Sequence, residues 1–152
     1  MANKFMEEAI NLSIDNEEGG PFGAVVVLDG EIIGRGRNKV TSSNDPTAHA
    51  EMVAIRSACQ NIGSFSLENA EIYSSCEPCP MCLAAIYWAR IRKIYYANTR
   101  GDAAAIGFDD SYIYDQISLD VKDRDMPMEQ MLQEEAKTAF TNWQLNTNKI
   151  KY

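Results

Sequence analysis

The chain has 152 residues, of which 45% are hydrophobic and 24% are charged. This length and composition predict one globular domain with a single core, spanning residues 1–152. The longest uncharged apolar run, at residues 24–28, is far shorter than the roughly 20 residues of a membrane-spanning helix. The N-terminus has no signal-peptide pattern, so we expect a soluble, cytoplasmic protein with no membrane partner.

The net charge of −8 disfavours partners that are themselves polyanions. The charge therefore argues against a nucleic-acid partner. Three of the four cysteines, at Cys76, Cys79 and Cys82, are closely and evenly spaced. Such crowding is typical of metal binding in a reducing compartment, whereas a disulfide framework spreads its cysteines along the chain.

The first predicted elements are a helix and a β-hairpin. Apolar side chains recur at helical spacing over residues 5–13, which predicts an amphipathic helix. Two short apolar runs follow, at residues 24–28 and 31–35, and they flank Asp29 and Gly30. Because Asp-Gly between two such runs favours a tight turn, these runs are predicted to be paired strands.

The middle of the chain predicts a second helix and then a strand, helix, strand unit. Residues 48–61 are rich in helix formers and stop before Gly63. Strands are predicted at residues 71–75 and 93–97, with a helix at residues 79–89 between them. A crossover of this kind is right-handed and joins parallel strands.

The C-terminal third has weaker patterns. We expect a loop region from Asn98 to about residue 124, and a fifth strand around residues 127–132. Five strands in this order predict a mixed five-stranded sheet. A last helix is expected over about residues 134–146, with one apolar stripe. The residues of this stripe are Ala136, Ala139, Phe140 and Trp143.

Two short segments carry the chemistry, PTAHAE at residues 46–51 and SCEPCPMC at residues 75–82. His49, Cys79 and Cys82 are the ligand types that bind one zinc ion tetrahedrally and leave a fourth position for water. Glu51 is then available to move the protons of that water. His-x-Glu followed by Pro-Cys-x-x-Cys is the signature of zinc-dependent nucleobase deaminases.

These residues stand at the starts of predicted helices. Side chains lean toward the N-terminus of a helix, so His49 and Glu51 can reach one point beyond the helix end. The helix dipole favours the thiolate forms of Cys79 and Cys82. Zinc lowers the pKa of a bound water toward about 7. We expect Glu51 to take the water proton as hydroxide attacks, deliver it to a ring nitrogen, and later protonate the departing ammonia.

Other interpretations of these residues stay open. Cys79 and Cys82 alone are compatible with a redox pair, although His49 argues for a metal. Cys76 can act as a fourth ligand, which would make a closed zinc site in a non-catalytic binding module. That arrangement leaves Glu51 without a role. Cys59 is expected to be a small buried hydrophobe.

Several longer segments of the sequence indicate which class of deaminase the chain resembles. They are GGPFGAV at residues 19–25, TSSNDPTAHAE at 41–51, SCEPCPMCLAAIYWAR at 75–90, GFDDSYIY at 107–114 and the final tyrosine. In these segments the chain resembles the bacterial guanine deaminases of the cytidine and deoxycytidylate deaminase superfamily. The resemblance implies a three-layer α/β/α sandwich and hydrolysis of guanine to xanthine and ammonia at C2. It also implies a homodimer that exchanges a C-terminal segment of about residues 117–152.

The resemblance implies roles for further residues. Asn38 hydrogen-bonds the purine, and Asp110 reads the nitrogen edge of guanine. Tyr152 closes over the site and comes from the partner subunit. The other residues placed at the substrate are Phe22, Ala50, Trp88 and Asp109. By residue type alone, Trp88 and Tyr87 are more typical of a core than of a substrate platform. Met126, Met128 and Met131 are typical of gap-filling packing and not of a metal site. The two aspartates fit a solvated turn as well as they fit a site.

The tRNA adenosine deaminases are the second candidate, because they share PTAHAE and EPCPMC. The acidic charge and the FDDS segment at residues 108–111 argue against them. Editing of tRNA requires a basic groove and a pocket for a flipped base. A tail that covers the pocket would exclude a nucleotide still joined to its strand.

Overall fold

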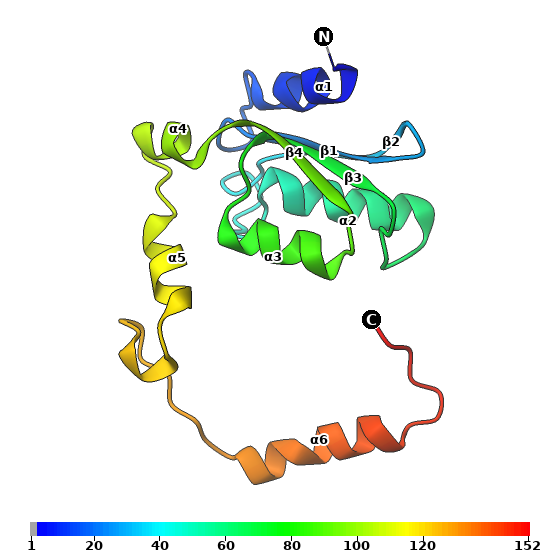
Figure 1. Cartoon of the computed structure of the whole chain (residues 1–152), viewed down its shortest axis with the longest axis vertical. Helices are drawn as coiled ribbons and strands as arrows, with labels where there is room; N and C mark the ends of the chain where they lie inside the picture. Colours follow the sequence, from blue (N-terminus) through cyan, green and yellow to red (C-terminus); the bar gives the residue numbers. More distant parts are fainter. Residues whose placement is uncertain (1–2) are drawn as a thin grey trace. The chain divides into compact units, whose positions relative to one another are not determined.

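The computed structural model describes residues 3–152, which divide into two compact units. Unit 1 runs to Ser111, and unit 2 comprises Tyr112–Tyr152. Figure 1 shows the elements. The helices are α1 (Lys4–Ser13), α2 (Ala50–Ile62), α3 (Pro80–Trp88), α4 (Arg100–Ala105), α5 (Ser111–Ser118), the 3-10 turn η1 (Val121–Asp123) and α6 (Gln133–Leu145). The strands are β1 (Gly23–Leu28), β2 (Glu31–Arg37), β3 (Glu71–Cys76) and β4 (Lys93–Asn98).

The strands form a mixed sheet at the centre of unit 1. Within the described residues the sheet has four strands in the order β2-β1-β3-β4. Strand β1 is antiparallel to both β2 and β3, whereas β3 and β4 are parallel. Asp29 and Gly30 have positive φ angles of 50° and 80°, as a tight hairpin turn requires. The predicted hairpin and the predicted parallel pair are therefore both confirmed.

The two faces of the sheet carry separate cores. Ala24 and Val26 of β1 belong to the core beneath α2 and α3, while Val25 and Val27 belong to the core beneath α1. This alternation follows from the two-residue period of a strand. Figure 1 shows α1 over one face of the sheet and α2 and α3 over the other. The three layers confirm the predicted α/β/α class.

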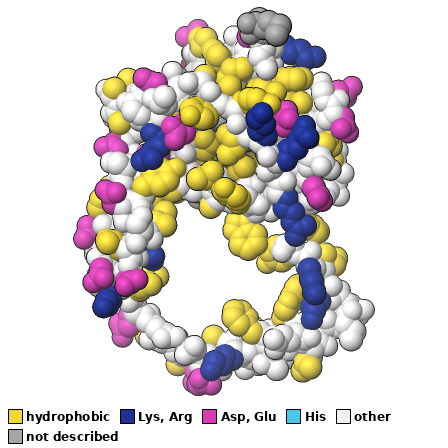
Figure 2. All heavy atoms as spheres, in the orientation of Figure 1, with side chains coloured by type: hydrophobic (Ala, Val, Ile, Leu, Met, Phe, Trp, Pro, Cys, Tyr) yellow, Lys and Arg dark blue, Asp and Glu magenta, His cyan; other side chains and the backbone are white. Residues whose placement is uncertain are grey.

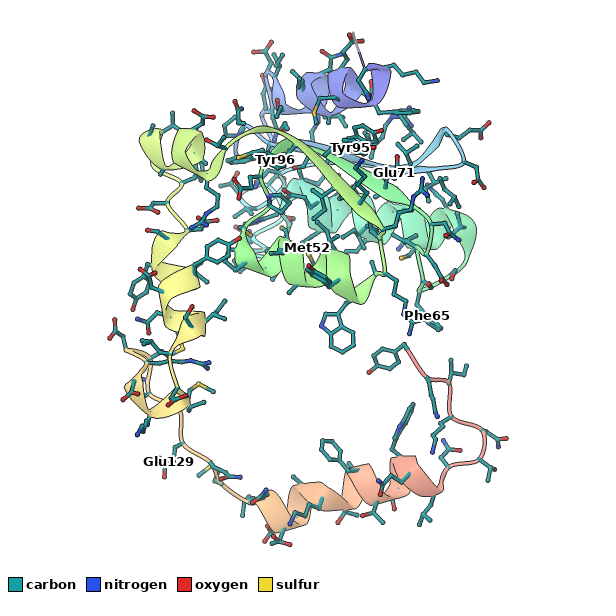
Figure 3. All side chains as sticks on the ribbon, viewed as in Figure 1. Met52, Phe65, Glu71, Tyr95, Tyr96 and Glu129 are labelled. Atoms are coloured by element: carbon teal, nitrogen blue, oxygen red, sulfur yellow. The ribbon has the colours of Figure 1, made fainter. Side chains whose placement is uncertain are left out.

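Helix α1 packs through one apolar side. The side chain of Asn3 accepts hydrogen bonds from the backbone N–H groups of Phe5 and Met6, so it caps the helix. Ala9 is fully buried. Tyr73 and Tyr95 of the sheet stack with ring centroids 4.5 Å apart, and Phe5 packs on Tyr73. Tyr95 is labelled in Figure 3, on strand β4.

Two glycines of β2 allow α2 to lie against the sheet. A Cβ atom on Gly36 would be 2.2 Å from the carbonyl oxygen of Ala50, and one on Gly34 would be 2.4 Å from that of Ala54. Neither distance is possible between real atoms, so the approach requires glycine at both positions. This contact fixes the N-terminal end of α2 on the sheet.

Two expectations for the region after Asn98 were wrong. The region contains the helices α4 and α5 where a loop was expected. Thr99 and Asp102 form a capping box that starts α4, a signal that the apolar pattern does not carry. The expected fifth strand is also absent, because residues 127–132 are irregular around Glu129, which Figure 3 labels. Pro127 lacks the N–H that a strand ladder needs.

Unit 2 has little internal packing. Arg124 donates to the carbonyl oxygens of Gln116 and Leu119 near the end of α5. Every residue of this unit is exposed or half-buried in the single chain, and apolar side chains lie on its surface (Figure 2). The most exposed apolar residues include Met126, Met131, Phe140, Leu145 and Tyr152. The predicted packing of the methionines is thus not found within the chain.

No helix within residues 3–152 is both long enough and apolar enough to cross a membrane.

Candidate metal centre and active site

Two helix N-termini bring the predicted ligands together. His49 is the N-cap residue of α2, and Cys79 is the N-cap residue of α3. Both have extended backbone angles, which is usual for a residue that precedes a helix. Cys82 lies in the first turn of α3, which begins at Pro80. The positive ends of two helix dipoles therefore lie at this site, where they favour anionic ligands.

The side-chain geometry fits a zinc ion. The Nδ1 atom of His49 lies 3.5 Å from the Sγ atom of Cys79 and 3.5 Å from that of Cys82. All ligand atoms of the three residues are within 4.8 Å of one another. For a tetrahedral ion with ordinary zinc bond lengths, the nitrogen and sulfur ligands should be about 3.6 Å apart. The three side chains thus already have the spacing of a zinc site, with Nδ1 as the nitrogen ligand.

The two thiols hold their protons unequally. A hydrogen bond from Cys82 lowers the pKa of Cys79 to about 4. The same hydrogen bond raises the pKa of Cys82, and burial raises it further. A hydrogen bond to Cys79 raises the pKa of the His49 imidazole. Zinc binds thiolates and neutral imidazole, so metal binding displaces the protons that these groups share.

Glu51 lies beside the ligands and inside the protein. Its side chain is buried, and its Oε1 atom accepts a hydrogen bond of 2.9 Å from the Ser74 hydroxyl. Burial raises the pKa of the Glu51 carboxyl. A carboxyl with a raised pKa next to a metal site is suited to proton transfer near neutral pH. Ser74 was not predicted from the sequence, although a serine at a core position of a strand was a signal for it.

Cys76 does not join the ligand group of the described residues. Its buried thiol donates to the carbonyl oxygen of Thr99 across 3.6 Å. Burial raises the pKa of Cys76 to about 11, which favours the thiol over the thiolate that zinc binds. The closed site with Cys76 as fourth ligand is therefore not supported. Cys59 packs against the core but is half-buried, whereas a buried side chain was expected.

A polar turn holds the segment before His49. The Oδ1 atom of Asp45 accepts hydrogen bonds from both the backbone N–H and the hydroxyl of Thr47. Arg56 of α2 lies 3.8 Å from Asp45. Lys39 donates its backbone N–H to the carbonyl oxygen of Ala48. These contacts tie the residues before His49 to the segment that follows strand β2 and to α2.

Asn38 follows β2, and its amide has a fixed orientation. The Oδ1 atom accepts from the backbone N–H groups of Gly20 at 3.2 Å and Val40 at 3.0 Å. Asn16 donates its Nδ2 to the carbonyl oxygens of Gly20 and Asn38, which holds the two segments together. With Oδ1 engaged in this way, Asn38 has its Nδ2 group, a donor, left for other partners.

Aromatic and acidic residues of the predicted substrate set also lie in unit 1. Phe22 packs edge-on against Phe108 with ring centroids 5.0 Å apart. Asp110 pairs with the Nε atom of Arg100 at 3.3 Å, and Asp109 accepts from the N–H of Ser111 at the start of α5. That hydrogen bond lowers the pKa of Asp109. Neither Arg100 nor Phe108 was predicted.

Trp88 and Tyr152 lie elsewhere in the chain. Trp88 ends α3, about 9 Å further along the helix axis than Cys82. Trp88 and Tyr87 are 71% and 76% exposed, so they are not part of the core of this chain. Tyr152 is in unit 2 and is also exposed. Ala50 is fully buried at the first position of α2.

Comparisons with known proteins decide the family. Residues 1–98 match the model of the cytidine and deoxycytidylate deaminase zinc-binding region. The chain is 48% identical to guanine deaminase of Bacillus subtilis (strain 168), over 97% of each sequence. The chain belongs to the cytidine and deoxycytidylate deaminase family. Within this deaminase family it is a homologue of guanine deaminase.

Structural similarity to the guanine deaminase relative covers the whole chain. The X-ray structure of the guanine deaminase from Bacillus subtilis matches with a TM-score of 0.95 and 47% identity, over 100% of this chain and 99% of that one. A tRNA-specific adenosine deaminase of Agrobacterium fabrum is 48% identical, but over only 57% of this chain and 59% of its own length. The tRNA deaminases are thus partial relatives of this deaminase.

Proposed function

We propose that the chain catalyses the zinc-dependent hydrolysis of guanine to xanthine and ammonia. The observation that carries this proposal is the His49, Cys79 and Cys82 group at zinc spacing, with buried Glu51 beside it, in a homologue of guanine deaminase. The reaction breaks the bond between C2 and the amino nitrogen and forms a bond between C2 and the oxygen of water. His49, Cys79 and Cys82 would hold the zinc.

Glu51 would move the protons. Zinc, when bound, supplies a water of lowered pKa. Glu51 accepts a proton from this water and delivers it to the ring nitrogen next to C2. It would then take the remaining proton from the oxygen now bonded to C2 and give it to the amino nitrogen, so that the carbonyl of xanthine forms as the bond from C2 to nitrogen breaks and ammonia departs. Burial of Glu51 keeps bulk water from exchanging with the protons in transit.

Asn38 and Asp110 would select the base. Asn38 can donate through Nδ2, which suits an acceptor such as the O6 atom of guanine. A carboxylate at Asp110 can accept from the N–H groups on the opposite edge. Adenine does not present N–H groups in that pattern, so it would not replace the water that the half-buried Asp110 carboxylate gives up on binding. We further propose that Phe22, Ala50, Trp88, Asp109 and Tyr152 line the substrate site.

We also propose a homodimer with exchanged C-terminal segments. Unit 2 exposes large apolar side chains, among them Phe140 at 77% and Tyr152 at 73%. Exposed apolar surface of this kind is typical of a segment that packs on a partner. In such a dimer Tyr152 would close over the site of the partner. Reduced cysteines in the metal group support a cytoplasmic location.

Editing of tRNA adenosine is the less favoured function. The net charge of −8 repels RNA, and the similarity to the Agrobacterium fabrum tRNA deaminase covers only 57% of this chain. The test is ammonia release by the zinc-loaded protein from guanine, guanosine, adenine, cytosine and tRNA, each supplied separately. Release from guanine alone is the expected result. Release from tRNA, or from none of the five, would overturn the proposal.

A further inference from the structure

We propose that Ser74 is a positioning residue that orients the Glu51 carboxylate for proton transfer. This inference rests on the proposed function, in which Glu51 moves the protons. In the proposed function, Ser74 contacts neither the zinc ion nor the substrate base. Its effect on the reaction therefore passes through Glu51.

Ser74 is a polar side chain in a place that otherwise holds apolar ones. It is 1% exposed, on strand β3, and the next residue on the same face is Ile72 of the core beneath α2. A hydroxyl buried there is unfavourable unless it is hydrogen-bonded. Its Oγ atom donates to Oε1 of Glu51 across 2.9 Å. The Glu51 carboxylate is therefore the partner that accounts for the hydroxyl.

The strand makes this contact rigid. Strand β3 is paired on both sides, with Ser74 opposite Ala24 of β1 and Tyr96 of β4. Because the backbone of a central strand cannot shift without breaking its ladder, the Ser74 hydroxyl has a fixed origin. Glu51 is similarly held, since α2 lies directly on β2. Serine and glutamate thus meet from two rigid elements.

The Glu51 carboxyl receives hydrogen bonds from its own backbone N–H and from the side chains of Ser74 and Cys82. Cys82 also contacts the Glu51 carboxyl, but its sulfur is a zinc ligand in the proposed site. Ser74 donates to Oε1 of the carboxyl, and this contact fixes the position of one of its two oxygens. A carboxyl whose orientation is fixed by such a hydrogen bond transfers protons along a defined direction. Loss of this support is expected to slow the chemical step and to leave binding of the base unchanged.

The experiment compares substitutions that keep or remove the hydroxyl. Ser74→Thr and Ser74→Val have nearly the same shape, and only the first retains a donor. Ser74→Ala removes the hydroxyl with the smallest change in volume. Ser75→Ala is the matched control, because Ser75 is a buried serine on the same strand whose hydroxyl accepts from the N–H of Gly23. Zinc content, kcat and KM are measured for each, with the base that the wild type deaminates.

We expect Ser74→Ala and Ser74→Val to bind one zinc, to keep KM within about twofold, and to lose kcat by roughly 10- to 100-fold. Ser74→Thr should recover kcat to within about threefold of wild type, and Ser75→Ala should keep kcat. Equal kcat in the threonine and valine variants would overturn the proposal. So would a loss of kcat in Ser75→Ala as large as that in Ser74→Ala.

A structural measurement separates this inference from the proposed function. Crystal structures of the zinc-loaded wild type and of zinc-loaded Ser74→Val should differ in the orientation of the Glu51 carboxylate. An unchanged Glu51 would overturn the role of Ser74, whatever base the enzyme deaminates. Failure of the wild type to release ammonia from guanine would overturn the proposed function. The role of Ser74 would then still be tested by the orientation of Glu51 in the two crystal structures.

Discussion

Gly19 lies directly against the Asn38 side chain: a Cβ atom on Gly19 would be 2.2 Å from Asn38 Oδ1. Gly19→Ala should therefore push the Asn38 amide out of place and weaken binding of the base. We expect KM for guanine to rise by about tenfold, the loss of one hydrogen bond. Gly101→Ala is the control, because a Cβ there meets only Thr99 at an ordinary 3.6 Å. Unchanged KM in Gly19→Ala would argue against Asn38 as a substrate contact.

Glu51→Gln should retain zinc and lose turnover. The amide keeps the size of the side chain but cannot accept and return a proton, so kcat should fall by roughly 10²- to 10⁴-fold. Metal analysis and steady-state kinetics on the same preparation check both parts. Glu68→Gln, at an exposed carboxylate, serves as control. Substantial turnover in Glu51→Gln would remove Glu51 from the mechanism.

Cysteine substitutions should separate the open site from a closed one. Cys79→Ser removes a ligand and should bind far less than one zinc per chain. Cys76→Ser should keep its zinc, since Cys76 bonds to the carbonyl oxygen of Thr99 and is outside the ligand group. Zinc content is measured by elemental analysis after gel filtration. Loss of zinc in Cys76→Ser would revive the closed Cys3His site.

Phe140→Asp should weaken the proposed dimer. Phe140 is 77% exposed on α6 in the single chain, and a charge there would be buried against a partner at high cost. Light scattering coupled to gel filtration should show a shift from dimer to monomer. Lys137→Ala is the control on the same helix, because its only described ion pair, with Glu134, is at the surface. A monomeric wild type would contradict the exchange.

The parts of unit 1 that sequence could predict are those with local signals. The short apolar runs that flank Asp29 and Gly30 predicted the hairpin, and the helix formers around Glu51 predicted α2. The strand, helix, strand pattern of residues 71–97 predicted the parallel pair. The metal ligands were also predictable, because zinc dictates their type and spacing. Helices α4 and α5 and the absence of a fifth strand were not, since the apolar pattern there is weak.

The supporting residues of the site were out of reach for a different reason. Ser74 and Glu51 are 23 positions apart, and Arg100, the first residue of α4, pairs with Asp110, which lies beyond the end of that helix. Such pairs depend on how helices and strands pack together, and the local patterns of a single sequence do not indicate these contacts.

Metal removal and restoration on guanine tests the central claim most directly. The chain is stripped of metal with a chelator, reloaded with one equivalent of zinc, and assayed at each stage for ammonia and xanthine. We predict no release from the stripped protein and equal amounts of ammonia and xanthine after reloading. Full activity in the stripped protein, or no xanthine after zinc is restored, would contradict the account.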